Sequence, residues 1–187
     1  MTTDWDARYS ARSWPPEPSP TVAGALADAL ADLPPGRAVD VAAGPGRHTR
    51  WLLDRGWSVT AVDSSAVGVE QGQGRCPEAT WVVADALTWT PVGGVDLVLA
   101  AYVQLGQAGF ARAAGWLVPG GRLVVVGHAL SGLARSPHGP RDPAMRHTPE
   151  ALRAAAAGLD VERAEEVERP DDGGPSVDVV LVARRPA

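Results

Sequence analysis

The stretch from Val39 to Thr49 constrains the fold more than any other part of the chain. Val39 and Val41 are β-branched and lie in a short apolar run, which is typical of a strand buried on both faces. Gly44 and Gly46 follow, and glycine adopts backbone angles that a Cβ would forbid. Apolar residues then return at helical spacing. The stretch therefore predicts a strand, a tight glycine turn and the start of a helix.

A glycine turn in this position lets a ligand approach the backbone and meet the helix N-terminus. A dinucleotide requires a third glycine, but Thr49 stands at that position. Asp40, which precedes Gly44 in the strand, would repel a pyrophosphate but would favour a ligand with an ammonium and a sulfonium group. The acid-x-x-x-Gly-x-Gly pattern resembles the first motif of class I S-adenosylmethionine-dependent methyltransferases. The resemblance implies S-adenosyl-L-methionine as cofactor and S-adenosyl-L-homocysteine as product.

A second acid ends the next predicted strand, which covers residues 57–62. Asp63 lies about 20 residues after the glycine turn, where a nucleotide-binding fold places an acid on the ribose hydroxyls. Asp63 is also a suitable N-cap for the helix expected over 65–75. Strand, turn and acid agree in register, which favours the ribose role.

The resemblance extends to two further strand ends. Asp85 and Ala86 follow the strand predicted over 80–84, where family members hydrogen-bond the adenine amino group and pack on its ring. Ala101 ends the strand predicted over 95–101, and its small side chain leaves room for the cofactor. The cofactor site implied by the resemblance consists of Arg8, Asp40, Ala42, Gly44, Gly46, Asp63, Ser64, Asp85, Ala86 and Ala101.

The remaining pattern predicts alternating helices and strands, followed by a closing hairpin. Further helices are expected over 21–33, 110–117 and 148–157, and further strands over 122–127, 161–167 and 177–183. Residues 129–147 have no period and are expected to form a long loop. By resemblance the fold is α/β, with a Rossmann-like, doubly wound, seven-stranded sheet of order 3-2-1-4-5-7-6. This sheet is mostly parallel and carries a C-terminal antiparallel hairpin. Residues 21–187 would form a single methyltransferase domain.

The N-terminal segment, residues 1–20, contains Trp5, Arg8, Tyr9 and Trp14. It is either a disordered leader, since termini often fray, or a flap over the cofactor. The run from Trp5 to Tyr9 resembles the N-terminal segment of small-molecule methyltransferases of the tellurite-resistance and thiol methyltransferase group. That resemblance implies that the segment covers the methionine end of the cofactor, with Arg8 on the methionine carboxylate.

Methyl transfer from a sulfonium requires little acid–base chemistry. The leaving thioether is neutral, so catalysis can consist mostly of positioning and desolvation. A base is required only when the acceptor must lose a proton, and the candidates are His128, Tyr102 and Tyr9. A single histidine in such a position is more often structural or solvated than catalytic, so a structural role stays open for these side chains. The four histidines and Cys76 lack metal-ligand spacing, so no metal site is expected.

Composition narrows the class of partner. The formal net charge of −5 argues against a nucleic-acid substrate. No apolar run approaches the ~20 residues of a membrane span. A single cysteine excludes an internal disulfide and fits a cytoplasmic location. We expect a monomer or a homodimer that acts on a small-molecule substrate.

Three functions remain open from the sequence. The favoured one is an S-adenosylmethionine-dependent methyltransferase for a small acceptor. The second is a protein that binds S-adenosylmethionine or S-adenosylhomocysteine without transferase activity, such as a regulator or scaffold. The third is a nucleotide-sugar or nicotinamide enzyme, which Asp40, Thr49 and the final hairpin disfavour.

Overall fold

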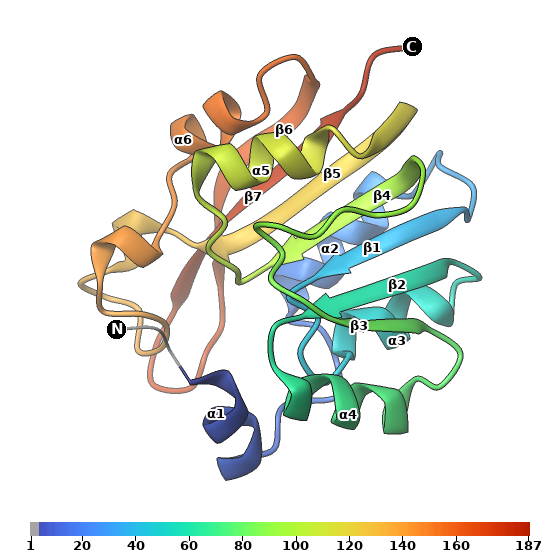
Figure 1. Cartoon of the computed structure of the whole chain (residues 1–187). Coiled ribbons are helices and arrows are strands. Elements are labelled where there is room, and N and C mark those ends of the chain that lie inside the picture. Colours follow the sequence, from blue (N-terminus) through green and yellow to red (C-terminus); the bar gives the residue numbers. More distant parts are fainter. Residues whose placement is uncertain (1–3) are drawn as a thin grey trace.

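The computed structural model describes residues 4–187, and a seven-stranded sheet runs through its centre (Figure 1). The strands lie in the order β3-β2-β1-β4-β5-β7-β6, so the predicted topology is confirmed. All neighbouring pairs from β3 to β5 are parallel, and β7 is antiparallel to both β5 and β6. The strands are β1 Arg37–Val41, β2 Ser58–Asp63, β3 Thr80–Val83, β4 Val95–Ala101, β5 Leu117–His128, β6 Asp160–Arg169 and β7 Ser176–Arg184.

Helices cover both faces of the sheet (Figure 1). They are α1 Trp5–Ala11, α2 Pro20–Ala29, α3 Arg47–Leu53, α4 Ala66–Arg75, α5 Gly106–Ala114 and α6 Pro149–Ala155. One apolar cluster joins α5 and α6 to the sheet through Phe110 and Leu152. A second cluster joins α2 and α3 to the other face through Leu26 and Leu52. Successive residues of each central strand alternate between the two clusters, as a doubly covered sheet requires.

The boundary between α5 and β5 differs from the prediction. The helix predicted over 110–117 runs from Gly106 to Ala114, and Leu117 already belongs to β5. The segment 119–121, which lies between the predicted helix and the predicted strand, is part of β5 at a bulge where the pairing with β4 shifts. The carbonyl oxygen of Gly121 accepts a hydrogen bond from the N–H of Arg185, so tertiary pairing keeps this glycine-containing segment in the sheet.

The loop 129–147 is tied at its two ends. A parallel bridge joins Ala129 to His147, and two short 3₁₀ helices, η1 Leu130–Gly132 and η2 Pro143–Met145, lie between them. The loop therefore begins and ends beside the last residue of β5. Because β1, β4 and β5 are parallel, their carboxyl ends share one edge of the sheet, which is where open α/β folds place their ligands.

Candidate functional site

The predicted strand, glycine turn and helix are confirmed. Ala42, Gly44 and Gly46 have φ angles of 55°, 53° and 83°. Within residues 4–187, Ala42 and Tyr102 are the non-glycine residues with positive φ, and each follows a central strand at the ligand edge. A Cβ on Gly46 would lie 2.9 Å from Cη2 of Trp81, so packing as well as backbone angle requires glycine there.

Asp63 ties this turn to the end of β2. The N–H of Gly44 donates to Oδ2 and the N–H of Ser65 donates to Oδ1, both at 2.8 Å. Ser65, rather than Asp63, is the N-cap of α4, because its Oγ accepts from the N–H of Gly68 at 3.0 Å. A carboxylate has about four lone-pair sites, so both oxygens keep a free position for a hydroxyl. This arrangement is compatible with the predicted ribose role.

Asp40 is completely buried beneath the turn. Its Oδ2 accepts a 2.7 Å hydrogen bond from Oγ1 of Thr49, which gives a role to the residue that breaks the dinucleotide pattern. Oδ1 has no hydrogen-bond partner among the described residues. Burial raises the pKa of Asp40 to about 7. A native-state pKa above the ordinary value means that ionisation of Asp40 opposes folding as pH rises from about 4 through about 7.

The other predicted cofactor contacts lie along the same edge. Ala101 is buried at the end of β4, and Ser64 is exposed between β2 and α4. Asp85 is exposed, and its Oδ1 accepts from the N–H of Leu87 at 2.8 Å. Ala86 is half-buried and follows directly. The strand ends bring these residues to one edge, which is compatible with the predicted adenine contacts.

Tyr9 lies over the glycine turn. A Cβ on Gly44 would be 2.5 Å from the Tyr9 hydroxyl, and one on Gly68 would be 2.9 Å from the Tyr9 ring. The side chain therefore occupies the space between the turn and the first turn of α4. Burial raises the pKa of Tyr9, and the nearby Asp63 carboxylate adds to the rise.

Hydrogen bonds connect the rest of α1 to α4. Oδ1 of Asp6 accepts from the Ser65 hydroxyl and from the N–H of Val67, and Nε2 of Gln71 donates to the Tyr9 carbonyl. A cavity of about 570 Å³ remains between this segment, the turn and α4. Arg8 is exposed, and its guanidinium lies 4.6 Å from the Trp5 ring centroid. Its predicted contact with the methionine carboxylate remains a prediction.

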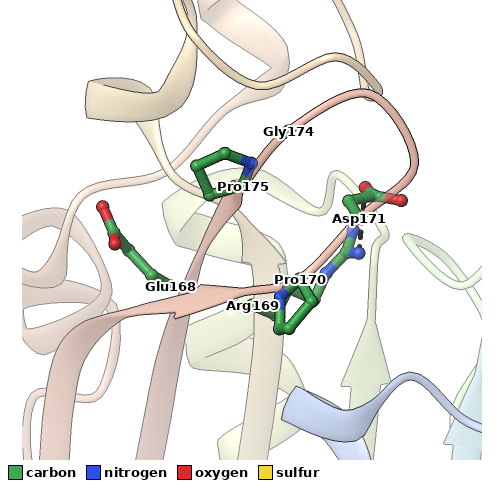
Figure 2. Close-up of a pocket in the computed structure, with 6 residues that line it drawn as sticks. All are labelled: Glu168, Arg169, Pro170, Asp171, Gly174 and Pro175. Carbon is green, nitrogen blue, oxygen red and sulfur yellow. Dashed lines mark ion pairs between the residues drawn. The ribbon is translucent and has the colours of Figure 1, made fainter.

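Tyr102, directly after β4, meets His128, the last residue of β5. Their ring centroids are 4.9 Å apart. Asp178 lies beside them in β7, where its Oδ2 accepts from the Tyr102 hydroxyl and from Nε of Arg169, both at 2.8 Å. A shallow pocket of about 440 Å³ lies at the turn of the β6–β7 hairpin, and Arg169 and Asp171 line it (Figure 2).

The sequence reasoning missed three members of this edge. Asp178 was visible as a lone acid within the apolar strand 177–183, which is the signal that could have identified it. Arg169 ends β6 and gave no comparable signal. Arg47 begins α3, and its guanidinium lies 5.6 Å from the Tyr102 ring centroid. Within residues 4–187 Arg47 has no ion pair or side-chain hydrogen bond, so it is a second candidate for the methionine carboxylate.

Two absences hold for the described part of the chain. No group of three or more histidine, cysteine, aspartate or glutamate side chains lies close enough together to hold a metal ion in residues 4–187. Over the same residues, no helix has both the length and the apolar character to cross a membrane. Cys76 is a buried free thiol.

Known proteins share part of this sequence. Residues 38–121, from β1 into β5, match a methyltransferase domain. Trans-aconitate 2-methyltransferase of Rhodopseudomonas palustris is 34% identical over 132 residues, which are 65% of this chain and 49% of that protein. The region from β1 into β5 is therefore similar to methyltransferase domains. The chain spans about half the length of that relative.

Solved structures agree with the fold. The N-methyltransferase NodS of Bradyrhizobium japonicum, in complex with S-adenosylhomocysteine, has a TM-score of 0.77 at 15% identity, with 98% of each chain covered. The [4+2]-cyclase SpnF has a TM-score of 0.67 at 19% identity, and the match covers 89% of this chain and 82% of the SpnF chain. The fold is thus shared with a protein named for another reaction, and activity must be argued from the site.

Proposed function

We propose that this protein transfers a methyl group from S-adenosylmethionine to a small-molecule acceptor. The observation that carries the proposal is the glycine turn of a methyltransferase domain, which Asp63 clamps through the N–H of Gly44. Gly44 and Gly46 would let the cofactor approach their backbone at the ligand edge, and Asp63 would accept the ribose hydroxyls. The unpartnered, buried Oδ1 of Asp40 would receive positive charge from the cofactor.

The cofactor, when bound, supplies a methyl group activated by a sulfonium and a neutral thioether as leaving group. The protein's residues would contribute position and exclusion of water. Asp85, Ala86 and Ala101 would line the adenine side. Tyr9 would cover the methionine side, where Arg8 or Arg47 would meet the carboxylate.

Thermal unfolding tests the ligand class. A ligand that binds only the native state raises stability, by about 2.7 kcal/mol at 100 times its Kd. We expect S-adenosylhomocysteine to raise the melting temperature and NAD and NADP to leave it unchanged. Stabilisation by NAD alone would favour the nicotinamide alternative instead.

Transfer itself separates the enzyme from a binding protein without activity. Purified protein incubated with S-adenosylmethionine and a panel of thiols, halides, amines, phenols and carboxylic acids should yield a methylated product, detected by mass spectrometry. Binding of S-adenosylhomocysteine with no product from any acceptor would support the regulator or scaffold. We further propose that the protein is cytoplasmic, acts on no nucleic acid and is a monomer or a homodimer.

We also propose that residues 1–20 form a cover for the cofactor. In support, α1 lies on the glycine turn and on α4 and leaves a cavity beside them. A ligand that reaches the Asp63 carboxylate would have to share or take the space that Tyr9 fills. The cover should therefore respond to the cofactor by an order–disorder change.

Limited trypsin digestion tests the cover. We expect cleavage after Arg8 and Arg12 in the free protein and protection by S-adenosylhomocysteine. Asp6→Asn weakens the two hydrogen bonds to α4 and should accelerate both cleavages, whereas Asp4→Asn, which alters only the N-cap of α1, serves as comparison. Equal cleavage rates with and without S-adenosylhomocysteine would contradict the role of the segment as a cover.

A further inference from the structure

His128 and Asp178 lie next to each other on neighbouring strands of the sheet. The two residues are register partners on the antiparallel strands β5 and β7. Nδ1 of His128 lies 3.7 Å from Oδ1 of Asp178, whose side chain is completely buried. No described residue donates a hydrogen bond to that Oδ1. The free carboxylate oxygen therefore faces one nitrogen of the histidine ring.

The other carboxylate oxygen is fully used. The Tyr102 hydroxyl and Nε of Arg169 both bind Oδ2, and the Ser19 hydroxyl lies 2.8 Å from the Tyr102 oxygen. These contacts hold the carboxylate in one orientation and balance its charge with that of Arg169. A buried carboxylate with one unsatisfied oxygen is costly in a strand of valines and leucines. The contact with Arg169 uses only Oδ2, so a structural role in balancing that charge does not explain why Oδ1 faces His128.

The ring of His128 is neutral and remains partly accessible. Its ring is 19% exposed, so most of it is covered while part remains open. Burial lowers the pKa of His128 to about 4, with Asp178 and Asp171 opposing that shift and Arg146 and Arg169 adding to it. The ring is therefore neutral at pH 7. Because Nδ1 faces Asp178, Nε2 is the nitrogen left for a substrate.

The pair lies on the ligand edge. Tyr102 follows β4, packs against the His128 ring and binds Asp178. The guanidinium of Arg47, the first residue of α3, lies 5.6 Å from the Tyr102 ring centroid. A continuous set of side chains thus connects the glycine turn to His128, and an acceptor beside His128 would also be beside the cofactor site.

The geometry points to His128 as general base and Asp178 as its positioning residue, for acceptors whose nucleophilic atom carries a proton, such as thiols, phenols and amines. The inference rests on the proposed methyl transfer. The acceptor atom forms a bond to the methyl carbon, and the carbon–sulfur bond breaks with its electron pair on sulfur. The acceptor proton passes to Nε2 and then to solvent. A carboxylic acid acceptor, already ionised at pH 7, would not require this base.

Nitrogen NMR of the histidine rings tests the positioning role. In ¹⁵N-labelled protein saturated with S-adenosylhomocysteine, we expect His128 to be neutral at pH 7 with its proton on Nδ1. His128→Gln assigns the signal. Asp178→Asn should change the tautomer, whereas Asp171→Asn, on the same hairpin and bound to the same Arg169, should preserve it. A proton on Nε2 in the unmodified protein, or no change in Asp178→Asn, would overturn the positioning role.

Methylation of thiophenol, phenol, benzylamine and benzoic acid tests the acceptor class. We expect product from at least one of the first three, and a kcat lower by about 10²–10⁴-fold in His128→Gln with little change in KM for the cofactor. Asp178→Asn should lower kcat and shift the pH profile. Product from benzoic acid alone, or an unchanged kcat in folded His128→Gln, would overturn the inference while leaving methyl transfer intact. No binding of S-adenosylhomocysteine would instead contradict the proposed function.

Discussion

Replacing Asp63 with asparagine is expected to weaken the binding of S-adenosylhomocysteine by about 2–4 kcal/mol, or roughly 30- to 1000-fold in Kd. The carboxylate would accept hydrogen bonds from two ribose hydroxyls, and charge-assisted bonds are the stronger kind. Asparagine also turns an NH₂ group toward the N–H of Gly44 or of Ser65, which replaces an attraction by a repulsion. The glycine turn would lose the hydrogen bond between the N–H of Gly44 and the side chain of residue 63, together with the contact to the ligand.

Titration calorimetry measures this change directly. Asp54→Asn is a matched control, because Asp54 is an exposed acid just after α3 whose partner is Arg50 rather than the turn. Its affinity for S-adenosylhomocysteine should stay unchanged. Thermal melts verify that Asp63→Asn remains folded. An unaltered affinity in a folded Asp63→Asn protein would remove Asp63 from the cofactor site.

Two glycine-to-alanine changes in α4 should have opposite effects on stability. A Cβ on Gly72 would lie 2.5 Å from Cζ3 of Trp81, whose Nε1 is bound to the carbonyl of Cys76 at 2.9 Å. A Cβ on Gly74 would meet no atom within 4 Å. Both changes gain about 1 kcal/mol of helix propensity, but only Gly72→Ala adds overpacking of about 1–3 kcal/mol or more.

The difference in melting temperature between Gly72→Ala and Gly74→Ala measures the cost of the steric clash with Trp81. For a domain of this size, 1 kcal/mol shifts the melting temperature by about 2–4 °C. Gly74→Ala should melt at or above the unmodified protein, and Gly72→Ala should melt several degrees below Gly74→Ala. Calorimetric or spectroscopic melts provide the measurement. Equal melting temperatures would show that Trp81 moves aside at little cost.

Local sequence patterns were sufficient for the framework of the site. The strand, turn and helix around Gly44 and Gly46 follow from side-chain periodicity and from backbone angles that are local properties. Asp63 and Asp85 were placed correctly at strand ends for the same reason. The three glycines of α4 give it a weak helix propensity, so it depends on packing, and Trp81 against Gly72 is the contact found.

Competition between local and tertiary preference explains the error at β5. Pro119 and the two glycines after it have turn propensity, so a helix, a turn and a shorter strand were predicted there. In the folded chain Leu117 pairs with Val95 of β4, and backbone bonds to Arg185 hold the segment in the sheet. Neighbouring strands therefore overrode the local signal.

Local sequence patterns determined the strand, the glycine turn and the ligand edge, and the resemblance of these motifs to a known family implied the fold and the order of the strands. Only the tertiary structure placed Tyr9 on Gly44 and Asp178 opposite His128. The physical reason is register: a slip of one residue between β5 and β7 would turn Asp178 to the other face of the sheet, and no local pattern specifies that alignment. Contacts between side chains that are distant along the chain depend on how whole elements pack, whereas periodicity and glycine angles act within a few residues.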